Sequence, residues 1–344
     1  MTLSRSASRH TTGPAMPTLL RSPLLKSFVS AAAALWLVTG AQAQSTYPSR
    51  PITLINPYAA GGPADTLARG LAMALEARLK QPVIVDSKAG GAATIGTGYV
   101  ARAKPDGYTL LISTSAGHVV TPLMQRIAYD GINDFAFIAV VANQPNVLVV
   151  NPDLGVDNLQ ALIALAKKEP GKLNYASAGT GGATHLGAEA FLQSAQIKLT
   201  HVPYGGAAPA LKDLLGGQVQ MGMLNLAATR AFIEQGKLKA LAYGGPKRTA
   251  LLPQVPTMAE AGFPAGASST WYTLAAPKGT PADALEVLRK TVAEINTDVT
   301  YQNVLASQGA ERMELSPAET TAFVQRDKVA MTKLLAELNM LDKK

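Results

Sequence analysis

The sequence predicts an α/β protein of two lobes, each a mainly parallel sheet flanked by helices, with a cleft between the lobes. Short β-branched runs alternate with stretches of helical periodicity, as they do in parallel sheets covered by helices. The 344 residues correspond to about two domains at the usual ~100–200 residues each. Two stretches are suited to carry the chain between the lobes, about 135–150, which we expect to be interrupted at Asn143-Gln144-Pro145, and about 268–277. Two such crossings define a hinge.

The first alternation begins with a strand at 52–55. Gly61-Gly62 then breaks the chain, and Pro63 suits the first position of a helix, where a backbone N–H is not needed. Apolar residues at helical spacing follow it. The next predicted elements are a strand at 82–85, a helix at 93–103 and a strand at 108–112.

The alternation resumes after residue 156, which predicts a second, inserted lobe. Its predicted elements are helices at 157–168, 184–195 and 208–215 and strands at 173–176, 199–202, 219–223 and 238–243. The chain then returns through a strand at 270–275 to helices at 282–296 and 317–338. We therefore expect one lobe at 44–143 plus 268–344 and the other at 144–267, with the ligand cleft between them.

Residues 1–43 are typical of an export signal. A basic region ending at Lys26 precedes an apolar run from Phe28 to Val38, and Ala41-Gln42-Ala43 fits the small-x-small cleavage pattern. The apolar run is about half of the ~20 residues that a membrane span needs. We expect cleavage after Ala43, with Met1 or Met16 as the start, and a protein free in a Gram-negative periplasm. An uncleaved membrane anchor is the alternative.

Composition excludes several classes of function. The chain has no cysteine, so it forms no disulfide, thiolate nucleophile or iron–sulfur cluster. The formal charge of +8 is concentrated at the start: without residues 1–43, 27 basic and 23 acidic residues remain, a net charge of +4. Like charges form no long run and aromatic residues are few, so we expect no nucleic-acid partner.

Two glycine-rich loops are the strongest candidates for a binding site. One is Tyr58-Ala59-Ala60-Gly61-Gly62-Pro63-Ala64-Asp65, and the other is Ser177-Ala178-Gly179-Thr180-Gly181-Gly182-Ala183-Thr184. Each lies between a predicted strand and helix, where exposed N–H groups favour an anion and ligands gather beyond the strand ends. Either loop alone could be only a tight turn, but one in each lobe favours an anion site.

The residues needed for catalysis or for a cofactor are scarce. The sequence has no G-x-S-x-G elbow, no His pair at metal-ligand spacing and no complete dinucleotide fingerprint. We therefore predict no catalytic residue, no metal and no cofactor. His185 begins a helix beside the second loop and either donates to a ligand or packs, whereas His201 is expected to be structural. Tyr204, at a strand end, is a candidate wall of the site, and Gly90-Gly91 a candidate cover.

The mature chain resembles the periplasmic solute-binding receptors of tripartite tricarboxylate transporters, known from Bordetella as Bug proteins. The motifs that carry the resemblance over nearly all of 44–344 are Tyr47-Pro48-Ser49-Arg50-Pro51-Ile52, Gly61-Gly62-Pro63-Ala64-Asp65, Asp106-Gly107-Tyr108-Thr109-Leu110-Leu111, Asn174-Tyr175-Ala176-Ser177, His185-Leu186, His201-Val202-Pro203-Tyr204, Leu214-Leu215-Gly216-Gly217-Gln218-Val219, Val255-Pro256-Thr257 and Glu260-Ala261-Gly262.

The resemblance implies a type II periplasmic binding protein, a Venus-flytrap fold that closes on a small carboxylate. It implies a monomer that delivers a dicarboxylate, tricarboxylate, aromatic acid or amino acid to membrane permease subunits. The carboxylate would be held by backbone amides, hydroxyls and water. The ligand-binding residues it implies are Tyr58, Ala59, Ala60, Gly61, Gly62, Asp65, Ser177, Ala178, Gly179, Thr180, Thr184, His185, Tyr204 and Asn225.

This sequence departs from the family at positions that bear on ligand choice. Gln220 stands where many members have an acidic residue, Asn225 is likewise neutral, and Asp86-Ser87-Lys88 replaces a Glu-Asn-Arg type of segment. The identity of the carboxylate therefore stays open. Two other functions also stay open, a sensor for a membrane signalling kinase and an exported hydrolase of carboxylate esters.

Overall fold

The structure, a computed structural model, describes residues 47–342. The predicted export signal at 1–43 and its cleavage site lie outside the described residues. Within 47–342, no helix has the length and apolar character needed to cross a membrane.

One lobe is built on a sheet whose strand order is β2-β1-β3-β9-β4. Its strands are β1 (Ile52–Asn56), β2 (Val83–Ser87), β3 (Thr109–Ser113), β9 (Ser269–Pro277) and the first part of β4 (Phe135–Val150). β1 runs parallel to β2 and β3, whereas β9 is antiparallel to both β3 and β4. The sheet is therefore mixed, because the strands that cross to the other lobe run back through it.

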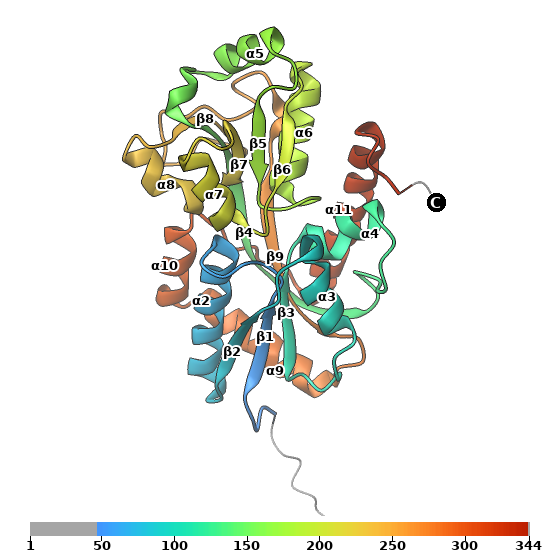
Figure 1. Ribbon diagram of the computed structural model, residues 1–344. Helices are drawn as coiled ribbons and strands as arrows, with labels where there is room; N and C mark the ends of the chain where they lie inside the picture. The colour runs from blue at the N-terminus through green and yellow to red at the C-terminus, as the bar shows by residue number, and fades with distance from the viewer. Residues whose placement is uncertain (1–46, 343–344) are drawn as a thin grey trace, which may run out of the picture. The chain divides into compact units, whose positions relative to one another are not determined.

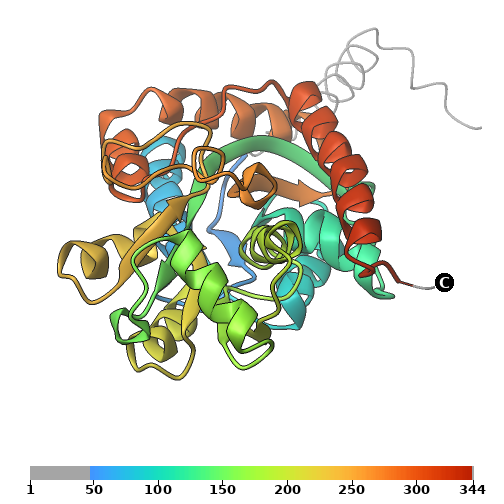
Figure 2. The same ribbon diagram turned by 90° about the horizontal axis from the view of Figure 1, so that it is seen from above.

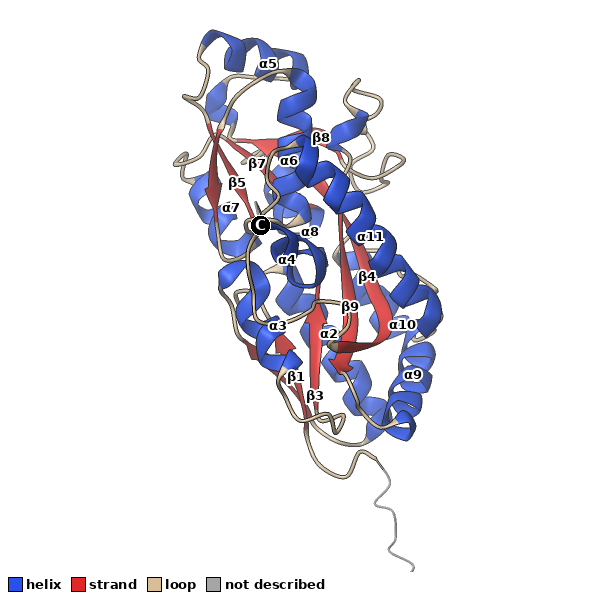
Figure 3. Ribbon diagram, turned by 90° about the vertical axis from the view of Figure 1, so that its right-hand side faces the viewer, coloured by secondary structure: helices blue, strands red, loops and turns tan. Residues whose placement is uncertain are grey.

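The other lobe continues from the end of β4, which pairs in antiparallel fashion with β7 and β8. Its strands are β5 (Asn174–Ser177), β6 (Thr200–Pro203), β7 (Met221–Asn225) and β8 (Lys239–Tyr243). β5 lies parallel between β6 and β7. Figure 1 shows β4 and β9 extending from one lobe into the other, and Figure 3 shows them as the longest strands. These two strands form the expected crossings.

Helices cover both faces of each sheet, and each face has its own apolar core. In the lobe of β1, α2 (Pro63–Leu79), α9 (Ala282–Asn296) and α10 (Val299–Ser307) share one core. The helices of the lobe of β5 are α5 (Leu159–Lys168) and α6 (Ala183–Ala195) on one face and α7 (Ala207–Leu215) and α8 (Leu226–Glu234) on the other.

The long C-terminal helix α11 (Pro317–Glu337) packs beside the π-helix η2 (Ala116–Val120), which continues into the short helix α4 (Thr121–Met124). Figure 2 shows it along the edge of the molecule. Its core also includes Leu186 of α6, and the side-chain amide of Gln193 in α6 donates to the carbonyl of Glu337 at 3.2 Å, so this helix contacts both lobes. The remaining helical segments are α3 (Thr94–Ala101), η1 (Gly91–Ala93), η3 (Pro152–Leu154) and η4 (Pro264–Gly266).

The predicted two-lobe α/β fold is confirmed, and α9 has the predicted bounds. The main difference is that β4 runs without a break through Asn143-Gln144-Pro145. Pro145 is the last residue of β4 paired with β9, and Asn146 is the first paired with β7. A residue without an N–H is tolerated where a strand changes partner. The lobe boundaries at 143/144 and 267/268 stay a prediction.

Candidate functional site

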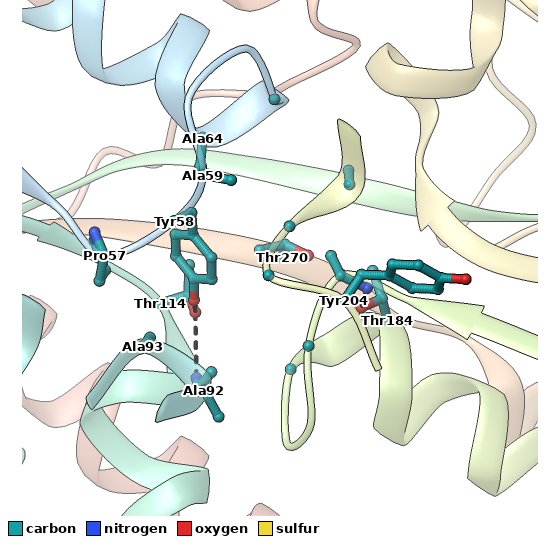
Figure 4. A pocket seen from close by; sticks show the side chains of 18 of the residues that line it. Pro57, Tyr58, Ala59, Ala64, Ala92, Ala93, Thr114, Thr184, Tyr204 and Thr270 are labelled. Atoms are coloured by element: carbon teal, nitrogen blue, oxygen red, sulfur yellow. Dashed lines mark hydrogen bonds between the residues drawn. The ribbon is translucent and has the colours of Figure 1, made fainter. Parts of the chain in front are cut away.

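A cavity of about 240 Å³ lies where the loops after β1, β5 and β6 meet (Figure 4). Its other walls come from the η1 turn, from the end of β3 and from Thr270 and Tyr272 of β9. The volume is below the ~300–1,000 Å³ of pockets for drug-sized ligands. The cavity therefore suits a small solute.

Three helices begin at this cavity. α2, α6 and α7 have the glycines Gly62, Gly182 and Gly206 at their N-caps, and none of these three N-caps makes a side-chain hydrogen bond. The first N–H groups of a helix have no acceptor within the helix, so uncapped ends favour an anion. The ends of α2 and α7 are close together, because a Cβ at Gly62 would lie 3.8 Å from the backbone nitrogen of Ala208.

None of the described residues that line the cavity has a charged side chain. The polar groups of its wall are hydroxyls and one amide, from Tyr58, Thr114, Thr180, Thr184, Tyr204, Asn225, Thr270 and Tyr272. Within residues 47–342, no group of three or more His, Asp or Glu side chains could hold a metal ion. The lining is therefore one of neutral donors and apolar surface.

Tyr58 points its hydroxyl toward Thr114 on one side of the cavity (Figure 4). The two hydroxyl oxygens are 2.6 Å apart. Burial raises the pKa of Tyr58 to about 12, although the hydrogen bond to Thr114 lowers it. The side-chain amide of Asn56 fixes the backbone of Tyr58, because its Oδ1 accepts the Tyr58 N–H at 3.2 Å. Tyr58 is thus a neutral, preoriented hydrogen-bonding group.

The first glycine loop is held by Asp65. The N–H of Gly61 donates to Oδ2 of Asp65 at 3.1 Å, and Arg69 Nε donates to the same oxygen at 2.9 Å. Burial raises the pKa of Asp65, but Arg69 and the Gly61 N–H outweigh it, so the pKa lies below its usual value. Asp65 therefore stabilises the loop as a carboxylate from behind the cavity wall.

The second glycine loop is held by three side chains. The N–H of Gly181 donates to His185 Nδ1 at 3.0 Å, and the N–H of Ala178 donates to Thr184 Oγ1 at 3.0 Å. The N–H of Gly179 donates to Oγ of Ser177 at 3.3 Å. This Oγ lies 2.8 Å from His201 Nε2. The loop amides are thus fixed by contacts within their own lobe.

The lobes touch at two places. The N–H of Ala59 donates to the carbonyl of Gly205 at 3.1 Å. At the second place, a Cβ at Gly181 would lie 3.0 Å from Val120 and 3.3 Å from the sulfur of Met124. These contacts close the two lobes around the cavity.

Nine of the predicted ligand-binding residues line this cavity, and five do not. Those that line it are Tyr58, Ala59, Gly62, Ala178, Gly179, Thr180, Thr184, Tyr204 and Asn225. Ala60, Gly61, Asp65, Ser177 and His185 are outside the lining. The side chains of the last three each accept a hydrogen bond from an N–H group of the loop that they hold.

Two of the lining residues are engaged elsewhere. The ring of Tyr204 extends away from Tyr58 (Figure 4), and its hydroxyl donates to Asp213 of α7 at 2.9 Å. The amide of Asn225 donates to Asn146 at 2.9 Å and to Thr270 at 3.1 Å. The backbone of Tyr204, more than its phenol, therefore faces the cavity.

Sequence reasoning missed Thr270, Tyr272 and the N-terminus of α7 as parts of the wall. The α7 end carried a usable signal, since Gly205-Gly206 is a Gly-Gly pair between a strand and a helix, like Gly61-Gly62 and Gly181-Gly182. Thr270 and Tyr272 had none, because a crossing strand has no pattern that tells a cavity wall from a core.

Two α/β lobes that are joined by crossing strands and close on a small cavity are the architecture of a periplasmic solute-binding protein. The family model described as tripartite tricarboxylate transporter family receptor matches residues 67–340. The chain belongs to this family of receptors, as its motifs predicted.

Individual relatives agree with this assignment. Protein BugT of Bordetella pertussis is 38% identical over 281 residues, 81% of this chain and 86% of that protein. A solved R. palustris structure with adipate is 34% identical, covers 85% of this chain and 98% of its own, and has a TM-score of 0.82. The structure of MatC from Rhodopseudomonas palustris with bound malate is 27% identical, covers 84% and 100%, and has a TM-score of 0.80.

Proposed function

We propose that this receptor captures a small carboxylate in the cavity and delivers it to the membrane permease subunits of a tripartite tricarboxylate-type transporter. The observation that carries the proposal is the convergence of the uncapped ends of α2, α6 and α7 on a cavity without charged side chains. The adipate and malate bound to relatives support a carboxylate. Dicarboxylates, tricarboxylates, aromatic acids and amino acids are the classes to test.

Helix N-termini and hydrogen bonds together can supply the free energy of micromolar binding without a cationic side chain. A helix N-terminus contributes roughly 0.3–1 kcal/mol at exposed sites and up to ~2 when partly buried. Hydrogen bonds to a charged group add ~1.5–3 kcal/mol each. A few such contacts reach the ~8.2 kcal/mol of micromolar binding, after the cost of ordering the closed state. We assign the carboxylate to the backbone around Gly62, Gly179 and Gly206, with Tyr58 and Thr114 toward the rest of the solute.

The receptor is proposed to work as a monomer in the periplasm after export, with cleavage following Ala43. We also propose that it converts no substrate. Ser177 Oγ and His201 Nε2 are 2.8 Å apart, but Ser177 is fully buried and outside the cavity lining. Burial lowers the pKa of His201 to about 4, too low for an effective base at neutral pH. This geometry disfavours the hydrolase alternative.

A thermal-shift screen of the purified chain with adipate, malate, citrate, benzoate and glutamate tests the proposal. A ligand at 100 times its Kd adds about 2.7 kcal/mol of stability, and the bound acid should be recovered unchanged. Loss of uptake of that acid on gene deletion identifies the transport role, whereas a lost transcriptional response with intact uptake identifies the sensor. If none of the five acids shifts the transition, or if the bound acid is converted in proportion to protein, the proposal is wrong.

A further inference from the structure

Two side chains at the same helical position hold the two glycine loops. Gly61 and Gly181 have φ values of 81° and 75°, and each lies two residues before its helix. The N–H of Gly61 donates to Asp65, and the N–H of Gly181 donates to Nδ1 of His185. Each acceptor is the third residue of its helix. The second loop therefore repeats the local geometry of the first with an imidazole in place of a carboxylate.

The two acceptors respond differently to a proton. Asp65 accepts as a carboxylate and is ion-paired with Arg69 at 2.9 Å. A ring nitrogen of histidine accepts only when it carries no proton, so His185 must be neutral with its proton on Nε2. His185 is 3% exposed, and burial together with the nearby ring of His201 lowers its pKa to about 3. It stays an acceptor throughout the neutral range.

The titratable groups of the described chain that face His185 come from three elements. On β6, His201 stacks on its ring at a centroid distance of 4.0 Å. On α6 itself, Glu189 Oε1 lies 4.0 Å from His185 Nε2. This carboxylate also accepts the hydroxyl of Tyr175 from β5. The imidazole is therefore packed with its Nε2 toward an acidic group and its Nδ1 toward the loop.

We propose that His185, as its neutral Nε2–H tautomer, is a positioning residue that fixes the second glycine loop without touching the solute. With Gly181 held by His185 and Ala178 and Gly179 held by Thr184 and Ser177, Thr180 lies between fixed amides and lines the cavity. The effect on binding rests on the proposed function, because it requires that this loop contacts the ligand. The effect of His185 on the conformation of the loop does not depend on the proposed function.

The first test uses the mature chain without ligand. The ¹⁵N spectrum of the His185 ring should show the Nε2–H tautomer, unchanged between pH 8 and 5. In His185→Leu, backbone amides of 178–182 should exchange roughly tenfold faster, whereas His185→Asn should keep them protected. The shorter side chain can reach, because Asp65 makes the equivalent contact from the same helical position. An Nδ1–H tautomer, or wild-type exchange in His185→Leu, would overturn the proposal.

The second test measures the Kd of adipate by calorimetry for the same variants. Loss of one hydrogen bond predicts roughly threefold to tenfold weaker binding by His185→Leu, with recovery in His185→Asn. Glu319→Ala is the matched control. Glu319 is also the third residue of its helix, and its carboxylate accepts the Ser316 N–H at 2.8 Å, but it lies away from the cavity. It should bind adipate like wild type.

The two tests separate the possible failures. If wild type binds none of the five acids of the thermal-shift screen but the exchange and tautomer results hold, the positioning role stands and the proposed ligand class fails. If adipate binds and His185→Leu weakens it no more than Glu319→Ala does, the positioning role is wrong. The positioning role is also wrong if the amides of 178–182 exchange as fast in His185→Asn as in His185→Leu, because a hydrogen-bond acceptor at position 185 would then not protect the loop.

Discussion

The N–H of Ala59, beyond the end of β1, donates to the carbonyl of Gly205, beyond the end of β6, at 3.1 Å. This bond joins the two lobes directly at the mouth of the cavity, which both residues line. A Cβ built on Gly206 would lie 3.6 Å from the Cβ of Ala59. The closed form of the receptor is therefore defined by backbone contact between two loops, with no ion pair at this point.

This contact can be trapped chemically. Disulfides need Cβ atoms ~3.5–4.5 Å apart, and the chain contains no other cysteine. Gly206 has a φ of 152°, which strains any side chain there, so Ala59→Cys/Gly206→Cys should lose some stability. We still expect the pair to cross-link under mild oxidation, and faster in the presence of an acid that the variant binds, because the ligand favours closure. Mass spectrometry of the oxidised protein measures the rate. Ala59→Cys/Gly236→Cys is the control and should not cross-link within the chain. Slower cross-linking with ligand present would contradict closure at this contact.

The hydroxyl of Tyr58 should matter for binding and that of Tyr204 should not. Tyr58 bonds to Thr114 in the cavity wall, whereas Tyr204 bonds to Asp213. If Tyr58 donates to the solute carboxylate, Tyr58→Phe removes a bond worth ~1.5–3 kcal/mol, and calorimetry should show affinity reduced by about tenfold or more. Tyr204→Phe is the matched control, with affinity and ligand ranking as in wild type. Reduced affinity in Tyr204→Phe with unchanged affinity in Tyr58→Phe would show that the tyrosine hydroxyl that binds the solute belongs to the other lobe.

The sequence predicts the helix starts that surround the site better than it predicts which side chains line the cavity. Gly61-Gly62 and Gly181-Gly182 mark two of the three helix starts, because Gly61 and Gly181 have positive φ values that favour glycine. The side chains were harder to assign, since the sequence predicts Asp65, Ser177 and His185 as ligand-binding residues. Only the structure shows that a neighbouring backbone N–H already uses each of them. Local hydrogen bonds of this kind depend on rotamers that no spacing rule specifies.

Gly179 should be sensitive to any side chain. Its φ is 143°, and a Cβ would lie 3.4 Å from the carbonyl oxygen of Tyr204. Gly179→Ala should therefore distort the loop that lines the cavity and weaken every carboxylate ligand together. Gly236→Ala is the control, because Gly236 has a φ of 70° with open space around it and lies away from the cavity. The Gly236→Ala variant should lose stability but keep the wild-type affinity for carboxylate ligands. Equal affinities of the two variants for carboxylates would show that the anion does not bind at this loop.

Export should remove the first 43 residues. The small residues Ala41 and Ala43 follow the apolar run at the position that signal peptidase requires. We expect the intact mass of the protein from a periplasmic extract to correspond to a chain that begins at Gln44. Ala41→Leu/Ala43→Leu should block processing, because the cleavage pocket accepts small side chains. A full-length chain recovered from the membrane in wild type would show that the segment is an anchor.

Stability should fall as the pH drops from about 6.5 toward 4. Burial lowers the pKa of His118 to about 4, of His185 to about 3 and of His201 to about 4. In this window the unfolded chain binds protons that the folded chain excludes, so the free energy of unfolding decreases as the pH decreases. Each histidine contributes up to ~1.4 kcal/mol per pH unit.

Urea unfolding at pH 7.5, 6.5, 5.5 and 4.5 measures this dependence. His185→Asn removes one of the three groups, so the slope of its unfolding free energy against pH should be smaller by about one proton. Paired carboxylates such as Asp65, whose pKa lies below its usual value, lose their contribution only below about pH 4, outside the range of the measurement. A free energy of unfolding that stays constant from pH 6.5 to 4.5 would mean that the three imidazoles are accessible to protons in the folded chain.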